Sequence, residues 1–235
     1  MAFQLLLLGY RGARLYAPEN TLPAFDLALE HGTDGFEFDV RCTRERHAII
    51  CHDAKLNGLT VRRQTLRRLR ESCKSAAEQA PTLDDILDRY QHSFLNIEVK
   101  VRGIEAMVAQ SVRRVRPRNY FISSFLPGVV RKLHELDPAL VLGALAQTRW
   151  QLRRWPNLPV EYVVPHYRLL SDRLVEKIHA SGRKAVTWTV NDPEKMLRAA
   201  KMGVDGIISD DTRLLVKTLA DGRRSPPARA AFSGR

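Results

Sequence analysis

The sequence has few cysteines and no long apolar run. Its three cysteines, Cys42, Cys51 and Cys73, are odd in number and lack the spacing of a metal site or a disulfide framework, which favours a reducing compartment. The apolar run at Leu5–Leu8 has no preceding basic residue and is too short for a signal-peptide core or a membrane span. We therefore expect a cytoplasmic protein, with Leu5–Leu8 inside a buried strand.

The chain also lacks two signatures of nucleotide binding, since neither G-x-G-x-x-G nor a Walker A pattern occurs. Aromatic residues make up 7% of the chain and do not interleave with the arginine run at 61–70, so we expect no specific nucleic-acid partner. The net charge is nevertheless +12 and the pI about 10.0. Such a balance favours anionic partners, either phosphorylated small molecules or an anionic membrane surface.

The most informative stretch runs from 34 to 53. In Gly35–Val40 apolar residues alternate with Glu37 and Asp39, which places both carboxylates on one face of a strand. Two adjacent carboxylates resist burial unless a cation or a shared proton offsets the cost, and hard divalent metals prefer oxygen ligands. A polar turn and a second apolar run, Ala48–Cys51, then lead to His52-Asp53. The stretch predicts a catalytic hairpin, or else an edge hairpin whose acids simply face water.

Strands and helices alternate along the chain of 235 residues, a length close to that of one (β/α)8 barrel. We predict a TIM barrel over residues 1–220, with Ala48–Cys51 as an extra hairpin strand, and an open doubly wound sheet as the alternative. The remaining segment, 221–235, is rich in Pro, Gly and Arg and is predicted to be a disordered basic tail. The eight predicted barrel strands are Phe3–Gly9, Gly35–Val40, Phe94–Lys100, Tyr120–Ser123, Val141–Leu145, Tyr162–Pro165, Lys184–Val190 and Gly206–Ser209.

Helical patterns fall between these strands. A helix follows Asn20-Thr21, and Thr82 is the predicted N-cap of another. Leucines at helical spacing predict a short amphipathic helix within Val61–Arg70, whereas Gln147–Pro159 shows no clear period. The later predicted helices are Gly128–Leu136, Asp172–Ser181, Pro193–Met202 and Thr212–Leu219.

Polar residues gather at the predicted carboxyl ends of the strands, where barrel enzymes place their active sites. Glu98 and Lys100 share one face of their strand, which indicates either a site at the strand tips or a surface salt bridge. The residues at or near such ends are Arg11, Glu37, Asp39, Glu98, Lys100, Ser123, His166, Trp188 and Asp210.

Taken in order, these motifs resemble those of the glycerophosphodiester phosphodiesterase family over essentially the whole chain up to the tail. The family pattern reads His-Arg-Gly, Pro-Glu-Asn-Thr, Glu-x-Asp, His-Asp, Glu-x-Lys, Trp-Thr-Val-Asn and Gly-hydrophobic-Asp. The matching segments here are Tyr10-Arg11-Gly12, Pro18-Glu19-Asn20-Thr21, Glu37-Phe38-Asp39, His52-Asp53, Glu98-Val99-Lys100, Trp188-Thr189-Val190-Asn191 and Gly206-Ile207-Ile208-Ser209-Asp210.

The resemblance implies a TIM barrel that uses a divalent metal, Ca²⁺ or Mg²⁺, to hydrolyse small-molecule glycerophosphodiesters to glycerol 3-phosphate and an alcohol. A lysophospholipid is an alternative substrate. The short region after His52-Asp53 implies an open site or a small cap, and nothing in the pattern indicates an oligomeric state. By position, the resemblance implies metal ligands at Glu37, Asp39 and Glu98, phosphate contacts at Arg11 and Lys100, a catalytic histidine at His52 and a pocket wall at Trp188.

One residue departs from the family pattern, because Tyr10 stands where the family has its first catalytic histidine. A phenol is protonated at neutral pH, so it can donate a proton but is a poor base. Three interpretations remain open. Tyr10 acts as acid or hydrogen-bond donor with His52 as base, His166 supplies the missing group, or the protein binds phosphate esters with weakened or no turnover.

Overall fold

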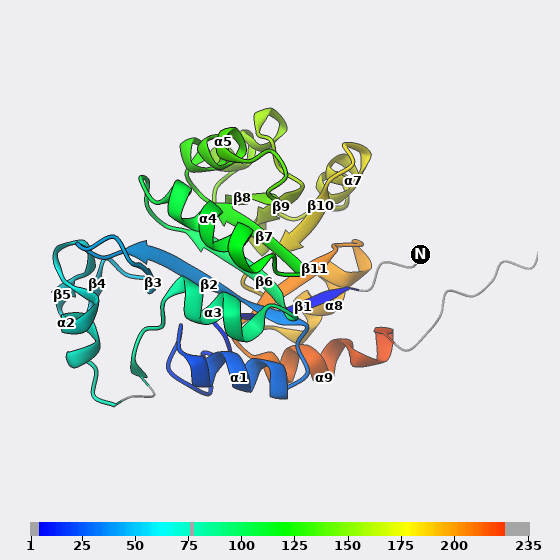
Figure 1. Cartoon of the computed structure of the whole chain (residues 1–235). Helices are drawn as coiled ribbons and strands as arrows, with labels where there is room; N and C mark the ends of the chain where they lie inside the picture. Colours follow the sequence, from blue (N-terminus) through cyan, green and yellow to red (C-terminus); the bar gives the residue numbers. More distant parts are fainter. Residues whose placement is uncertain (1–4, 76–77, 224–235) are drawn as a thin grey trace, which may run out of the picture.

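A computed structural model describes residues 5–75 and 78–223, and its core is a closed barrel of eight parallel strands (Figure 1). The strands pair in chain order, and β1 closes the ring by pairing with both β2 and β11. The predicted TIM barrel is therefore confirmed, and the open sheet is wrong. The barrel strands are β1 (Leu6–Tyr10), β2 (Gly35–Cys42), β6 (Phe94–Val99), β7 (Asn119–Ser124), β8 (Leu142–Ala146), β9 (Tyr162–Pro165), β10 (Lys184–Thr187) and β11 (Gly206–Ser209).

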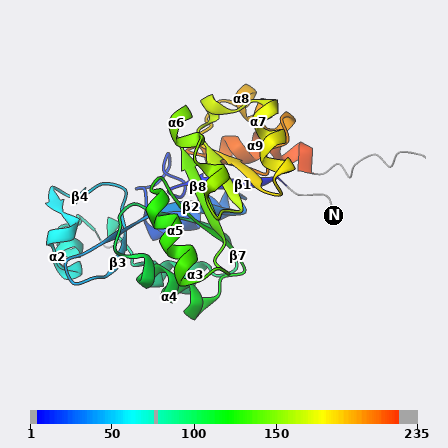
Figure 2. The same cartoon turned by 90° about the horizontal axis from the view of Figure 1, so that it is seen from above.

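Helices surround the strands in both views (Figures 1 and 2). The helix predicted after Thr21 begins at Leu22, where the Thr21 side chain accepts a hydrogen bond from the Ala24 amide. The helices of the outer layer are α1 (Leu22–Glu30), α3 (Leu83–Tyr90), α4 (Glu105–Val115), α5 (Pro127–Leu136), α6 (Arg149–Leu152), α7 (Asp172–Ala180), α8 (Pro193–Lys201) and α9 (Thr212–Arg223).

Successive side chains of each barrel strand point alternately outward and inward, which divides the buried side chains into two layers. On β2, Phe36 and Phe38 belong to the core between strands and helices, where Phe36 stacks on Phe25 of α1 with ring centroids 4.3 Å apart. Glu37 and Asp39 take the opposite face, toward the barrel interior. A second cluster that includes Phe121 and Tyr162 packs within the barrel. The interior is thus apolar, with buried carboxylates near the carboxyl end of β2.

A small lobe interrupts the alternation after β2, beside the barrel (Figure 1). It begins with β3 (Ala48–Ile50), which pairs antiparallel with the end of β2 outside the barrel, as predicted for the hairpin. A separate apolar cluster that includes Ile49, Val61 and Leu69 holds the lobe together. Its remaining elements are β4 (Lys55–Leu56), β5 (Leu59–Thr60), the 3-10 helix η1 (Val61–Arg63) and α2 (Leu66–Glu71).

The structure corrects three predictions about helices. The single helix expected over Val61–Arg70 is divided, because Thr65 caps a new helix at α2. The segment without a clear period contains α6 and a 3-10 turn, η3 (Trp155–Asn157). Helix α4 was not predicted; its N-cap position is Ile104, which makes no side-chain cap bond, so the sequence carries no start signal there.

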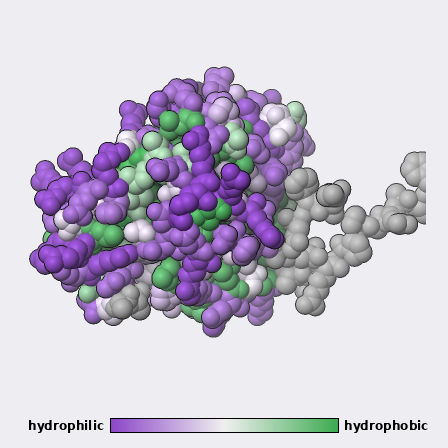
Figure 3. All heavy atoms as spheres, viewed as in Figure 1, coloured by the Kyte–Doolittle hydropathy of each residue, from purple (hydrophilic) through white to green (hydrophobic). Residues whose placement is uncertain are grey.

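The described residues end with α9, which runs through 221–223; the rest of the predicted tail, 224–235, lies outside them. The face shown in Figure 3 is mainly hydrophilic, with apolar residues exposed in small separate areas. Among the helices in the described ranges, none is long and apolar enough to cross a membrane.

Candidate active site

The turn between β1 and α1 fixes the first site residues. Arg11 has a left-handed backbone conformation, with φ of 54°, and its amide donates to Glu37 Oε2 over 3.1 Å. The next residue, Gly12, has φ of 80°, and a Cβ there would lie 2.7 Å from the Ala24 carbonyl oxygen of α1. Glycine is therefore needed for close packing against α1, and a strained turn holds Arg11 against the carboxylates.

Three buried carboxylates meet at the carboxyl ends of β2 and β6. Strand register places Asp39 beside Glu98, and one oxygen of each of Glu37, Asp39 and Glu98 lies within 4.8 Å of the others. In the described structure Glu37 Oε1 is buried without a hydrogen-bond or ion-pair partner, while the buried Asp39 Oδ1 has only an ion pair with Lys100. An all-oxygen cluster with a buried, unpartnered acceptor atom suits a hard divalent cation such as Ca²⁺ or Mg²⁺.

Two cations already face this cluster. Lys100 Nζ lies 2.6 Å from Glu98 Oε1 and 3.2 Å from Asp39 Oδ1, and Arg11 Nε lies 3.2 Å from Asp39 Oδ2. Burial and then repulsion from neighbouring carboxylates raise the pKa of Glu37 well above its ordinary value and that of Glu98 to about 7. Two cations do not offset three buried carboxylates, so the cluster favours a further positive charge, either a proton or a metal ion.

The loop before α1 supplies two residues that orient the site. Asn20 Nδ2 donates to Asp39 Oδ2 over 2.9 Å, and the Asp39 amide donates back to Asn20 Oδ1 over 3.2 Å. Glu19 Oε1 accepts from Arg11 Nη1 over 2.8 Å. The residue pattern at Asn20-Thr21 predicts only the start of a helix, and the Pro-Glu-Asn-Thr motif is the one sequence signal of this second role for Asn20.

Tyr10 lies at the end of β1, beside the carboxylates. Arg11 Nη2 donates to the Tyr10 hydroxyl oxygen over 2.7 Å, so the hydroxyl hydrogen remains available for another acceptor. Burial, reinforced by the charge of Glu37, raises the pKa of Tyr10 far above its ordinary value. Tyr10 is therefore held in its protonated form, suited to donating a proton and unsuited to accepting one.

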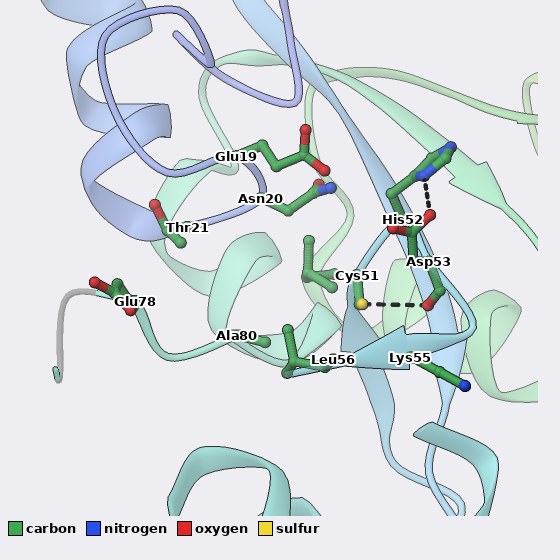
Figure 4. A pocket seen from close by; sticks show the side chains of 11 residues that line it. Glu19, Asn20, Thr21, Cys51, His52, Asp53, Lys55, Leu56, Glu78 and Ala80 are labelled. Atoms are coloured by element: carbon green, nitrogen blue, oxygen red, sulfur yellow. Dashed lines mark hydrogen bonds and ion pairs between the residues drawn. The ribbon is translucent and has the colours of Figure 1, made fainter. Parts of the chain in front are cut away.

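His52 follows β3, and its Nδ1 lies 2.8 Å from Asp53 Oδ1. Burial lowers the pKa of His52 below 6.5, although the charge of Asp39 opposes the shift. A neutral imidazole held by a carboxylate is a suitable general base. Figure 4 shows His52 and Asp53 at the edge of a pocket whose walls also include Glu19, Asn20 and Cys51.

Trp188 and His166 lie together on another side of the mouth. The Trp188 ring lies 6.3 Å from the Tyr10 ring, between centroids, and 5.3 Å from His166. His166 Nδ1 accepts from the Arg168 amide, and in the described structure no hydrogen bond or ion pair joins His166 to the three carboxylates. Around the carboxylate cluster the structure thus gathers Tyr10 and the site residues implied by the resemblance, whereas His166 contacts the site through Trp188.

Two other polar residues predicted at strand ends, Ser123 and Asp210, do not add to the carboxylate cluster. Ser123 donates to Asn96 inside the barrel. Asp210 accepts from Asn191 and pairs with Arg14, whose Nη2 also lies 3.3 Å from Glu19. These contacts connect the last barrel strand to the turn that carries Arg11.

The fold and the site define a class: a TIM-barrel enzyme with a buried carboxylate cluster at the carboxyl ends of its strands. Within that class, residues 11–214 match the model of the glycerophosphoryl diester phosphodiesterase family, and the chain belongs to that family. This confirms the resemblance read from the motifs, and membership places the chain among the phosphoric diester hydrolases.

Individual relatives agree with this assignment. A glycerophosphodiester phosphodiesterase of Caldanaerobacter subterraneus is 30% identical over 92% of this chain and 98% of its own length. The glycerophosphodiester phosphodiesterase structure from Thermotoga maritima is 25% identical, with a TM-score of 0.75 over 92% of this chain and 99% of that one. An Oleispira antarctica phosphodiesterase, solved with the product sn-glycerol-3-phosphate, shares the fold, with a TM-score of 0.79, 23% identity and coverage of 93% and 98%.

Proposed function

We propose that this protein hydrolyses glycerophosphodiesters to glycerol 3-phosphate and an alcohol in a metal-dependent reaction, with Tyr10 in the role of a proton donor. Family membership supports the reaction class, and the product bound to the Oleispira antarctica relative is sn-glycerol-3-phosphate. The observation that carries the metal dependence is the cluster of three buried carboxylates, in which Glu37 Oε1 has no partner among the described residues.

Glu37, Asp39 and Glu98 are the proposed metal ligands. A bound divalent metal would supply Lewis-acid stabilisation of charge on the phosphoryl oxygens. Asn20 and the Arg11 amide orient two of the ligands by hydrogen bonds to Asp39 and Glu37. Such supporting bonds restrict ligand rotation and so favour a defined coordination geometry.

Arg11 and Lys100 are the proposed phosphate contacts. Both side chains are mostly buried beside carboxylates, which holds the cations in place before a ligand arrives. A fixed cation in a poorly solvated site stabilises phosphoryl charge more strongly than a mobile one in water. Trp188, whose ring lies near Tyr10, forms one wall of the proposed substrate pocket.

His52 and Tyr10 divide the proton transfers in this proposal. His52, whose pKa is lowered, accepts the proton of the attacking water, while Tyr10, whose pKa is raised, donates its proton to the oxygen of the leaving alcohol. The charge of Asp39 acts on the pKa of both groups, which supports the assignment of both to one site. An acid so weak as Tyr10 is a slower donor than a histidine, so we expect modest turnover.

The direct test is hydrolysis of glycerophosphodiesters and an aryl phosphodiester by the wild-type protein, with and without EDTA. We expect turnover with Ca²⁺, Mg²⁺ or Mn²⁺ that EDTA abolishes, and its loss in Glu37→Gln. Glu78→Gln, on the wall of the pocket in Figure 4 and outside the carboxylate cluster, is the matched control. Hydrolysis of no diester with any of these metals would exclude the proposal and leave phosphate-ester binding without turnover.

A further inference from the structure

A basic surface begins at the catalytic face, outside the site described above. Two adjoining grooves share Arg153 and are lined by apolar and uncharged polar side chains, Lys177 and arginines. In the described structure, no carboxylate lines either groove. We define the basic rim as the six arginines of these grooves, Arg102, Arg131, Arg149, Arg153, Arg154 and Arg168.

Three arginines of the basic rim lie close after the carboxyl ends of barrel strands. Arg102 follows β6, Arg149 opens α6 directly after β8, and Arg168 follows β9. Arg168 is also two residues beyond His166, whose ring packs edge-to-face on Trp188 at the mouth. Because connections that follow the strand ends surround the active site in this fold, the rim borders the substrate entrance.

The charge of the rim is not neutralised within the chain. Among the described residues, none of the six arginines forms an ion pair with a carboxylate, although Arg168 donates to the Tyr167 hydroxyl. On the outer helices, by contrast, Arg89, Arg113 and Arg114 each pair with an aspartate. Like charges kept close together without counter-ions are stabilised by an anionic partner.

Apolar side chains project from the same face. Trp150, in α6, is 63% exposed, with the Arg154 guanidinium 3.3 Å from the centre of its ring. Leu15, in the turn after β1, is 62% exposed. Strands β1 and β8 are four places apart in the ring of eight, so Leu15 and Trp150 flank the mouth from opposite sides.

We propose that the catalytic face docks on an anionic lipid surface, with the basic rim against the lipid phosphates and Trp150 in the interfacial layer. Arginines together with an exposed indole match the chemistry of such an interface, since Trp favours the boundary between headgroups and acyl chains. A nucleic acid fits less well, because a single exposed Trp beside arginines provides no series of stacking platforms.

The test measures binding by co-sedimentation with phosphatidylcholine vesicles that contain either no phosphatidylglycerol or about 30% of this anionic lipid. We expect binding only with phosphatidylglycerol, and weakening as salt rises. The triple variant Arg149→Gln/Arg153→Gln/Arg168→Gln should bind roughly 100-fold more weakly, since each basic residue at an anionic surface contributes about fivefold. This readout does not depend on hydrolysis, so its failure is distinguishable from failure of the proposed activity.

The matched control removes three positive charges at the opposite end of the barrel, Arg116→Gln/Arg118→Gln/Lys201→Gln. Arg116 and Arg118 lie between α4 and β7, and Lys201 is the last residue of α8, which precedes β11. Their substitution should change binding less than about threefold. Unchanged thermal unfolding midpoints establish that both triple variants are folded. Vesicle binding should also shift wild-type tryptophan emission to shorter wavelength, and Trp150→Phe should remove that shift.

Three outcomes would overturn the proposal. They are no binding to phosphatidylglycerol vesicles at low salt, equal weakening by both triple variants, and tighter binding to single-stranded DNA or RNA than to vesicles. The second would mean that net charge, and not the rim, governs association. The third would identify a nucleic acid as the partner of this face.

Discussion

At the scale of single residues, Tyr10 distinguishes this chain from the family pattern. Its hydroxyl accepts from Arg11 and its pKa is raised by burial, so the phenol can serve one of the two proton-transfer roles that a histidine can serve. The structure thereby supports the interpretation in which Tyr10 donates and His52 accepts. His166, the alternative source of the second group, packs on Trp188 and Tyr167 and forms no hydrogen bond or ion pair with the carboxylates in the described structure.

Substitutions at Tyr10 test this role. Tyr10→Phe should lower kcat by about 10²-fold or more, because a positioned proton donor contributes about 10²–10⁴-fold. Tyr10→His should raise kcat above that of wild type, since an imidazolium is a stronger acid than a phenol. Metal affinity, measured by calorimetry, should be nearly unchanged in both variants. Wild-type turnover in Tyr10→Phe would show that the hydroxyl takes no part.

The pH dependence of turnover tests His52. Burial lowers the pKa of His52 below 6.5, so the imidazole is a neutral base at pH 7 and becomes protonated as the pH falls. We expect kcat/KM to decline on an acidic limb below pH 6.5 and to be flat just above it. In His52→Asn that limb should vanish, with residual activity about 10²–10⁴-fold lower. A limb that stays in place would instead belong to a carboxylate, such as Glu98.

At the scale of elements, the sequence predicted strands better than helices. All eight barrel strands were predicted to within a few residues, because each is a short apolar run followed by polar or glycine residues. Helix α4 was missed since Ile104 provides no cap, while α3 was anticipated from Thr82. The role of Asn20 in orienting Asp39 could not be predicted from the local residue pattern, because the hydrogen bond joins residues 19 apart in sequence.

The cap of α3 yields a stability prediction. Thr82 Oγ1 accepts from the Asp85 amide, and Asp85 Oδ2 accepts from the Thr82 amide. Thr82→Ala should lower the free energy of unfolding by about 1 kcal/mol, or the midpoint by roughly 2–4 °C. Thr82→Ser keeps the acceptor oxygen and should retain most of that stability. Equal losses in the two variants, measured by thermal unfolding, would contradict a capping role.

At the scale of the whole molecule, the carboxylate cluster connects stability to metal binding. Three carboxylates buried with two cations disfavour the ionised, metal-free state. A cation that binds only the folded chain shifts the unfolding equilibrium toward the native state. We therefore expect metal binding at the site proposed for catalysis to stabilise the barrel as well.

Thermal unfolding with and without metal measures this effect. At 100 times its dissociation constant, the metal should contribute about 2.7 kcal/mol, which corresponds to a rise of roughly 5–10 °C for a chain of this size. Glu37→Gln should abolish the rise. The variant should also be as stable as metal-free wild type, because the raised pKa of Glu37 favours an uncharged group there. Marked destabilisation of metal-free Glu37→Gln would contradict that account.

The closure of the barrel by β1 also bears on how the protein is made. Strand β1 is synthesised first, yet one of its two partners, β11, ends at Ser209. During translation, the edge of β1 that later meets β11 stays unpaired until most of the chain has left the ribosome. Arg11 directly follows β1, and Asp39 and Glu98 lie on β2 and β6, the next two barrel strands along the chain. The acidic site can therefore assemble on the nascent chain well before the barrel is sealed.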